Sequence, residues 1–321
     1  MTERHLTVAA IQMASGDWDL QANMQRAERL IRQAAAAGAQ LIVCPELFMC
    51  PYFCIDQNVQ HLELAEPFEG NPRVAHFARL AGELGVVIPI GFFERAGNAA
   101  YNSVAMADAD GRILGVYRKT HIPDGPGYTE KFYFTPGDTG FKVWDTRYGR
   151  IGLAICWDQW YPETARSLAL MGAEVLCFPT IIGSEPHSAE MDTAGHWQRT
   201  MQGHAAANMV PVLAANRIGR ETGLGNGNPQ QQALSANFYG SSFIADHLGE
   251  KVAEANRVDE CILIHRFELE GIRLDRQSFG FFRDRRPEMY AALLSSDGQH
   301  TRPDLRRPAQ FLPNDTQEQN P

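Results

Sequence analysis

Short apolar runs of strand length alternate with amphipathic segments of helical length over most of this 321-residue chain. Residues 6–11 and 41–44 predict two buried strands, and the segment between them repeats apolar residues at helical spacing until Gly38. A second predicted helix over 72–85 leads into a strand over 86–90. Strands that alternate with helices are typical of an α/β fold, in which helices cover the faces of a sheet.

The second half of the chain repeats this order of elements. One helix-to-strand junction in the first half looks like one in the second, because Gly38 precedes Pro45 by the same distance in sequence that separates Gly172 from Pro179. The likeness predicts internal pseudo-symmetry, with chance as the alternative for so short a match. The further predicted strands cover 100–106, 113–117, 151–155, 175–178, 211–214 and 261–267, with a hairpin-like pair of strands across 248–249 before the last of them. The further predicted helices cover 162–172 and 197–208.

Charge and hydropathy exclude several classes of protein. The formal net charge is −9, whereas a nucleic-acid-binding surface needs a basic face, so we expect no nucleic-acid partner. The chain lacks a run of about 18 apolar residues, which predicts no transmembrane helix and no membrane partner, and its first residues lack the pattern of a secretory signal. Its 6 cysteines are sparse and several lie in apolar runs, which predicts reduced thiols in a cytoplasmic protein.

The predicted organisation is a single domain over residues 1–295, followed by a C-terminal tail over 296–321. The tail has too few hydrophobic residues to order by itself, so we expect it to be flexible or to dock on a partner. A polar stretch with three glycines over 221–232 predicts a loop. Both an active-site lid and a plain surface excursion are compatible with that loop.

Three polar side chains stand at or just after the ends of predicted strands, where α/β sheets build their sites. They are Glu46, Lys119 and Cys156. Cys156 precedes a turn into a helix, where backbone N–H groups can bind an oxyanion and favour a thiolate. Taken singly, Lys119 is more often a surface charge and Cys156 a buried strand cysteine, and Glu46 is as compatible with a solvated loop carboxylate as with a site residue. Together they form the set of general base, oxyanion stabiliser and nucleophile.

Metal and nucleotide chemistry have less support. Cys44, Cys50 and Cys54 lack the spacing of a paired zinc motif, and no histidine follows them at ligand spacing. The chain also lacks the glycine patterns of phosphate-cradling and dinucleotide-binding loops. We therefore expect no metal and no cofactor.

The segments around the three candidate residues resemble the motifs of a known family. Residues 45–46, 118–121 and 155–158 are similar to the glutamate, lysine and cysteine motifs of the nitrilase superfamily of carbon–nitrogen hydrolases. The resemblance implies a four-layer α-β-β-α sandwich, a thiol mechanism without metal, and a homo-oligomer that is a dimer or larger. It also implies that Glu130, which matches the superfamily's second glutamate, holds the lysine and helps to orient water.

The substrate can be argued from charge. Between Phe178 and Gln198 there are three acidic residues and no lysine or arginine, which favours a small cationic carbamoyl substrate over one that ends in a carboxylate. A solvated acidic loop without ligand contact is the alternative. Further stretches resemble one branch of the superfamily, whose substrate is a carbamoylated diamine, and they cover 130–134, 136–141, 183–186, 201–204 and 282–287.

The reaction that this resemblance implies is hydrolysis of a urea-type C–N bond through a carbamoyl-thioester. On this interpretation Glu185 binds the substrate's ammonium group, the Trp157 backbone N–H helps to stabilise the oxyanion, and Tyr52 is a further substrate-binding candidate. Two alternatives stay open. One is a related hydrolase of carbamoyl amino acids, carbamoyl-β-alanine, aliphatic amides or nitriles. The other is a non-catalytic binding protein on the same scaffold.

Overall fold

The computed structural model describes residues 4–16, 18–185, 188, 190–225 and 234–299. Its chain divides into two compact units, of which one extends to Ser278 and the other begins at Phe279. This boundary precedes the one predicted from the sequence at 295, and most of the predicted tail lies outside the described residues. Every described strand lies in the first unit.

The first sheet combines strands from both ends of the first unit. It consists of two groups of three hydrogen-bonded strands, the first ordered β14 (Cys261–Glu268), β1 (His5–Gln12) and β2 (Leu41–Val43), and the second ordered β3 (Ile88–Ala96), β4 (Ala99–Ala107) and β5 (Ile113–Arg118). β1 pairs in parallel with β2, and β3, β4 and β5 form an antiparallel meander. The hydrogen bonds Ile42 N to Val87 O (3.0 Å) and Val87 N to Gln40 O (2.8 Å) join β2 to the chain that enters β3.

The second sheet is built from the second half of the chain. Its strands are β13 (Lys251–Glu254), β12 (Phe243–Ala245), β9 (Val212–Asn216), β8 (Val175–Thr180), β7 (Arg150–Leu153) and β6 (Lys142–Asp145), in that order. β7, β8 and β9 run in parallel, β6 is antiparallel to β7, and β12 is antiparallel both to β9 and to β13. A separate hairpin of β10 (Ile218–Thr222) and β11 (Ser235–Tyr239) follows β9.

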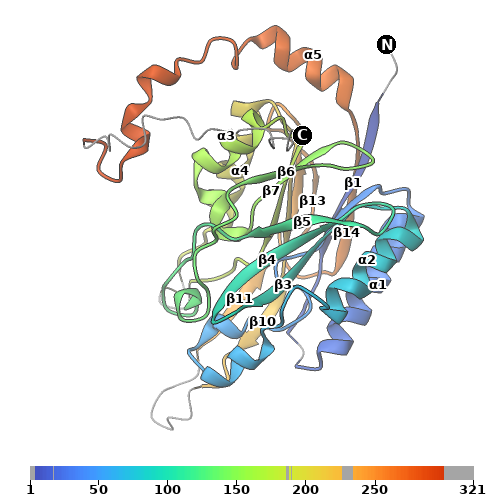
Figure 1. Cartoon of the computed structure of the whole chain (residues 1–321), viewed down its shortest axis with the longest axis vertical. Helices are drawn as coiled ribbons and strands as arrows, with labels where there is room; N and C mark the ends of the chain where they lie inside the picture. The colour runs from blue at the N-terminus through green and yellow to red at the C-terminus, as the bar shows by residue number, and fades with distance from the viewer. Residues whose placement is uncertain (1–3, 17, 186–187, 189, 226–233, 300–321) are drawn as a thin grey trace, which may run out of the picture. The chain divides into compact units, whose positions relative to one another are not determined.

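Helices cover the outer face of each sheet, and the two sheets meet through β1 and β9. The helices are α1 (Leu20–Ala36), α2 (Pro72–Leu84), α3 (Pro162–Leu170), α4 (Ala194–Asn208) and α5 (Leu269–Phe279). α1 and α2 pack on the first sheet and α3 and α4 on the second, so that the helix pairs lie on opposite sides (Figure 1). The chain therefore forms the predicted α-β-β-α sandwich.

Internal pseudo-symmetry, predicted from two short junctions, is confirmed by the strand registers. In the first half Val8, Ala9 and Ala10 of β1 face Leu41, Ile42 and Val43 of β2. In the second half, β7 faces β8 in the same way, through three consecutive pairs that begin at Ile151 and Val175. The next strand joins at the same place in both halves, since Leu176 N donates to Pro211 O (2.9 Å) as Ile42 N does to Val87 O.

The termini of α2 show why several helices could be predicted. The Asn71 side chain accepts hydrogen bonds from the backbone N–H groups of Arg73 and Val74, which caps the helix before Pro72. At its other end Gly85 has a φ of 67°, a left-handed conformation that glycine adopts without steric cost. These signals are local, so the sequence alone reveals them.

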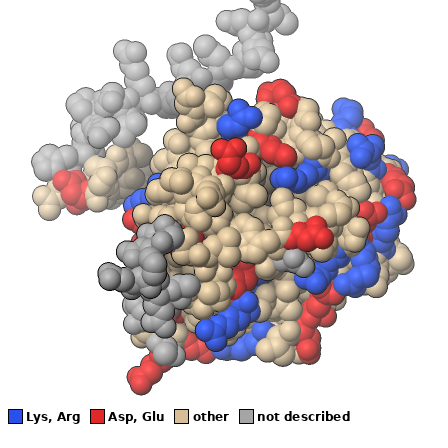
Figure 2. Space-filling model, turned by 90° about the horizontal axis from the view of Figure 1, so that it is seen from below, with Lys and Arg blue, Asp and Glu red and all other residues tan. Residues whose placement is uncertain are grey.

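Other elements differ from the prediction. β6, β10, β11 and α5 were not predicted, and Glu221, which was assigned to a polar loop, is buried in β10. Thr222 of that predicted loop also lies in β10, and residues 226–232 of it lie outside the described residues. Within the described chain, no helix is long and apolar enough to cross a membrane. Figure 2 shows acidic and basic side chains interspersed on one face of the molecule, so the negative net charge does not gather there.

Candidate active site

The structure brings the three predicted strand-end residues together and buries all of them. Glu46 follows β2 and Lys119 follows β5, both in the first sheet, whereas Cys156 follows β7 in the second. Their exposed fractions are 1%, 0% and 5%. The site therefore needs both halves of the sandwich, and each half supplies part of the chemistry.

Lys119 lies between two carboxylates. Its Nζ donates to Glu46 Oε1 at 2.8 Å and to Glu130 Oε2 at 2.7 Å. Burial by itself lowers the pKa of Lys119, but the charges of Glu130 and Glu46 outweigh burial and hold that pKa well above its usual value. The side chain is therefore a fixed cation, which suits the stabilisation of a developing negative charge.

Glu46 is held through only one of its two carboxylate oxygens. Oε1 accepts from Lys119 Nζ and, at 2.6 Å, from the Asn102 side-chain amide in β4. Oε2 is buried and has no hydrogen-bond partner among the described residues. An unpartnered buried carboxylate oxygen is costly in a folded protein, and this one is free to accept a proton from a neighbouring group.

Glu130 is held through both oxygens, because Tyr52 OH donates to its Oε1 at 2.8 Å. Burial raises the pKa of Glu130 above its usual range, and Lys119 opposes that rise. Tyr52, a substrate-binding candidate in the sequence, is buried with its hydroxyl directed at Glu130. The structure therefore places Tyr52 beside a carboxylate of the site.

Cys156 sits on a strained turn at the start of the 3-10 helix η4 (Cys156–Trp160). Its φ of 40° lies in the left-handed region, which is uncommon for a residue with a side chain. Burial raises the pKa of the Cys156 thiol well above its usual value, Glu46 raises it further, and Lys119 only partly offsets them. The direction of this shift opposes the thiolate that was expected at this turn, so the thiol needs a neighbouring base to lose its proton.

A cavity of about 280 Å³ opens onto Cys156. The described residues that line it include three acids and no lysine or arginine. Glu185 and Trp157, both predicted to bind substrate, are among them. The full lining is Pro123, Asp124, Gly125, Pro126, Tyr128, Glu130, Cys156, Trp157, Trp160, Ile181, Ile182 and Glu185. Such a lining attracts a cation and disfavours an anion.

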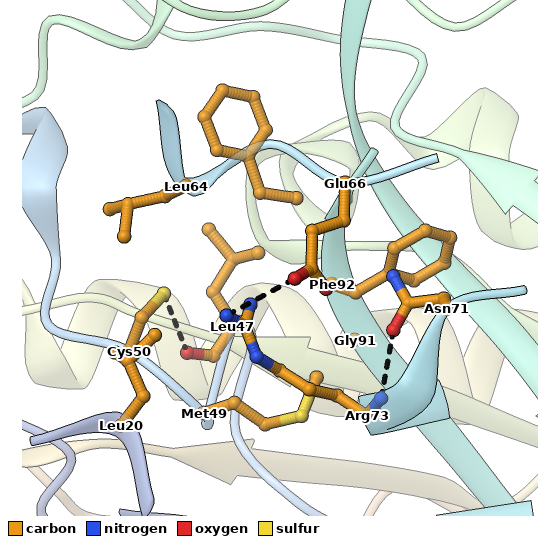
Figure 3. Close-up of a pocket in the computed structure, with 11 residues that line it drawn as sticks. Leu20, Leu47, Met49, Cys50, Leu64, Glu66, Asn71, Arg73, Gly91 and Phe92 are labelled. Carbon is orange, nitrogen blue, oxygen red and sulfur yellow. Dashed lines mark hydrogen bonds and ion pairs between the residues drawn. The ribbon is translucent and has the colours of Figure 1, made fainter. Parts of the chain in front are cut away.

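A second, much smaller cavity of about 20 Å³ lies against the turn that follows Glu46 (Figure 3). Cys50 Sγ donates to Leu47 O at 3.6 Å there, and Arg73 pairs with Glu66 at 3.3 Å. A space of this size holds about one water molecule and no substrate. The described residues contain no group of three or more side chains that could hold a metal ion.

A buried ion pair that the sequence analysis missed holds the turn after Glu46. Arg217, fully buried after β9, donates through one nitrogen to Glu221 Oε1 at 2.8 Å. Its other terminal nitrogen donates to the carbonyl oxygens of Glu46 (3.3 Å), Leu47 (3.0 Å) and Cys50 (3.0 Å). The second half of the chain thereby fixes the backbone that carries the carboxylate of the first half.

Asp158 forms another such link, between the lysine segment and the cysteine turn. This buried carboxylate accepts from Tyr117 OH (2.7 Å), His121 N (2.9 Å) and His121 Nδ1 (2.8 Å). It also accepts from Ile155 N (3.0 Å), one residue before the cysteine. A polar residue within an apolar strand or motif is the only sequence signal that marks Asp158, Asn102 and Arg217.

Comparison with known proteins decides the family. The sequence matches the carbon–nitrogen hydrolase family over residues 7–277. The chain belongs to this family. The solved structure of a carbon–nitrogen hydrolase from Helicobacter pylori superposes with a TM-score of 0.84 at 38% identity, covering 91% of this chain and 99% of that one. Saccharomyces cerevisiae Nit3, of the nitrilase superfamily, superposes with a TM-score of 0.73 at 27% identity, covering 88% of this chain and 97% of that one.

Two curated relatives of this carbon–nitrogen hydrolase carry different names. It is 53% identical over 295 residues to the N-carbamoylputrescine amidase of Arabidopsis thaliana, which covers 92% of this chain and 97% of the relative. It is 51% identical over 286 residues to the citrullinase of Francisella tularensis, which covers 89% of this chain and 97% of the relative. Both similarities span nearly the whole chain at almost the same identity, so sequence identity alone does not decide which relative's substrate this chain uses.

Replacement of Arg217 by Met should lower the free energy of unfolding of this hydrolase by about 3–5 kcal/mol, because the buried Glu221 carboxylate loses its counter-ion. Urea denaturation measures the change. Arg32→Met is the control, since Arg32 pairs with Glu83 on the surface and should cost under about 1 kcal/mol. Addition of Glu221→Gln to Arg217→Met should recover part of the loss. An equal loss of unfolding free energy in the two arginine variants would contradict the stabilising role of the buried Arg217–Glu221 pair.

The raised pKa of Cys156 predicts that the free enzyme contains no thiolate at this position near neutral pH. The difference in absorbance at 240 nm between the wild type and Cys156→Ala, followed from pH 6 upward, should show no thiolate step below about pH 9. The other five cysteines are common to both proteins and cancel in the difference. A step near pH 7 would show that the lysine charge outweighs burial.

Proposed function

We propose that this chain hydrolyses N-carbamoylputrescine to putrescine, carbon dioxide and ammonia. Its similarity to curated N-carbamoylputrescine amidases, that of Arabidopsis thaliana among them, supports the assignment. The observation that carries it is the cavity at Cys156, whose described lining is acidic and aromatic and holds no cationic side chain. A neutral carbamoyl group at one end of the substrate and an ammonium group at the other suit that lining.

The first half of the reaction uses the held carboxylate and the neutral thiol. Glu46 Oε2 takes the thiol proton of Cys156 while Sγ attacks the carbamoyl carbon. Lys119 and the backbone N–H of Trp157 stabilise the oxyanion that forms. Glu46 then gives the proton to the departing nitrogen as the C–N bond breaks. Putrescine leaves, and a carbamoyl-thioester remains on Cys156.

The second half of the reaction hydrolyses the thioester. A carboxylate removes a proton from water, the resulting hydroxide attacks the carbonyl carbon, and the thiolate leaves and recovers a proton. Glu46 suits this step better than Glu130, because both oxygens of Glu130 are engaged by Tyr52 and Lys119 whereas Glu46 Oε2 is unpartnered. The product is carbamic acid, which decomposes to carbon dioxide and ammonia.

The charge of the cavity separates this substrate from citrulline. Citrulline carries the same carbamoyl group but adds a carboxylate beside its ammonium group, and carbamoyl-β-alanine ends in a carboxylate alone. A buried carboxylate needs an arginine, a lysine or several N–H donors. The described cavity lining offers Asp124, Glu130 and Glu185 instead. Aliphatic amides and nitriles lack a cation and leave those charges unmatched.

We also infer a cytoplasmic homo-oligomer, a dimer or larger. The six cysteines are all free in the structure and five are buried, which supports a reducing compartment. The oligomer rests on the resemblance to the nitrilase superfamily alone. Sedimentation of the purified chain measures the assembly directly.

Ammonia release from a panel of substrates tests the proposed function. N-carbamoylputrescine should give a kcat/KM at least about tenfold above those of citrulline, N-carbamoyl-β-alanine, an aliphatic amide and a nitrile, which is the minimum expected from one charged hydrogen bond. Cys156→Ala should abolish release, because its thiol is the nucleophile. A higher kcat/KM with citrulline than with N-carbamoylputrescine would assign the cavity to citrulline. No ammonia release from any of the five compounds would favour a non-catalytic binding protein.

Replacement of Glu185 by Gln should lower kcat/KM for N-carbamoylputrescine by roughly 10- to 150-fold, because a charged hydrogen bond to the ammonium group is lost. An uncharged analogue, N-butylurea, should lose little. Glu190→Gln is the matched control, since Glu190 lies on the same excursion but is exposed and outside the described cavity lining. Equal losses on both substrates would place Glu185 outside the amine subsite.

A further inference from the structure

We propose that Asn102 is a positioning residue, which orients the Glu46 carboxylate so that one oxygen is held and the other is left to exchange protons with Cys156. The inference rests on the proposed role of Glu46 as the base. It adds a residue that neither the three strand-end motifs nor the second glutamate includes.

The two carboxylate oxygens of Glu46 have different hydrogen-bond environments. Asn102 Nδ2 and Lys119 Nζ both donate to Oε1, at 2.6 Å and 2.8 Å, while Oε2 has no partner among the described residues. Two donors on one oxygen and none on the other define the plane of the carboxylate. Of the two oxygens, Oε2 is thus the one available to the thiol.

Lys119 alone does not impose this choice. An ammonium group is a compact charge with three rotatable donors, so it binds either carboxylate oxygen as the carboxylate turns. A side-chain amide is planar and its N–H direction is set by the strand that carries it. Asn102 lies within β4 and is 1% exposed, so its amide is carried by a paired strand and buried from solvent. The amide therefore selects one carboxylate orientation.

The orientation of the Asn102 amide follows from its neighbour. A rotated amide would place Oδ1 against the Glu46 carboxylate, where two acceptors repel. In the observed orientation Oδ1 is buried without a partner among the described residues. The contact between Asn102 and Glu46 thus leaves two buried oxygens without a hydrogen-bond partner among the described residues, one on each side chain. Because each unsatisfied oxygen lowers the stability of the fold, the contact points to function rather than to stability.

Asn102 also contacts the lysine segment through its backbone. Its carbonyl oxygen accepts from Lys119 N at 2.8 Å, as part of the pairing of β4 with the end of β5. Any substitution at 102 keeps this backbone bond, so a variant removes only the contact with Glu46. The position of Lys119 is then unchanged, and the effect on the carboxylate is isolated.

The chain supplies a matched control at the next position. Ser103 is also fully buried in β4, and its hydroxyl donates to a different buried glutamate, Glu94, at 2.6 Å. Successive strand residues point to opposite faces, so Ser103 lies on the face away from Asn102. Ser103→Ala removes a buried hydrogen bond to a carboxylate that is not part of the proposed site. A merely structural role for Asn102 predicts the same result for both variants.

The experiment compares Asn102→Leu, which keeps the size of the side chain and removes its donor, with Ser103→Ala. Asn102→Leu should lower kcat by about 10- to 100-fold with KM within about threefold, because the base is displaced after substrate is bound. Alkylation of Cys156 by iodoacetamide, followed by mass spectrometry at pH 8, should slow by about tenfold, since the thiol loses its oriented base. Ser103→Ala should leave kcat and alkylation within about twofold of the wild type.

The alkylation measurement requires no substrate, so it separates this inference from the proposed function. Slow alkylation in Asn102→Leu supports the positioning role even if another carbamoyl compound is the true substrate. Wild-type kcat and alkylation rates in Asn102→Leu would overturn it. If Asn102→Leu does not fold, Asn102→Ser and Asn102→Ala are compared at matched Tm, and the hydroxyl donor of Ser should restore kcat by about threefold or more. Equal kcat in those two variants would also overturn the inference.

Discussion

A fully buried ammonium group between two buried carboxylates is the interaction on which the site depends. Removal of three charges from water costs several kcal/mol for each ion, and only close pairing offsets that cost. Lys119 reaches both Glu46 and Glu130, and Asn102 and Tyr52 add one donor to each carboxylate. The ends of β2 and β5 must therefore meet within hydrogen-bond distance, and the first sheet provides that arrangement. The same charges keep Lys119 cationic and leave one oxygen of Glu46 unpartnered for chemistry.

The nucleophile comes from the other sheet, so the two halves must be joined with equal accuracy. Two buried polar groups form these joints. Arg217 binds the backbone after Glu46, and Asp158 binds both the lysine segment and the cysteine turn. Because burial and Glu46 raise the pKa of the Cys156 thiol, its reactivity depends on the distance to a base. Arg217 and Asp158 therefore affect the reaction through the position of the Cys156 thiol relative to the Glu46 carboxylate.

Much of this architecture was predictable because its signals are local. Asn71 and Gly85 mark the ends of α2, and the repeated junctions before β2 and β8 revealed the relation between the halves. The three strand-end residues were predicted for the same reason, since each follows an apolar run. β6, β10 and β11 were missed, because they are short strands without the regular apolar alternation that marks a strand in the sequence. The burial of Glu221 was missed because its partner, Arg217, is identified only by the fold.

The sequence by itself determined the order of elements, the residues at the strand ends and the acidic character of the segment that supplies Glu185 to the cavity. These properties depend on neighbours within a few positions, so no knowledge of packing is needed to read them. Only the tertiary structure decided which oxygen of Glu46 is held, in which direction the pKa of the Cys156 thiol moves, and which arginine anchors the turn. Each of these depends on burial and on groups far apart in the chain, such as Asn102 against Glu46 and Arg217 against Cys50. Desolvation and hydrogen-bond geometry arise only when those groups are brought together.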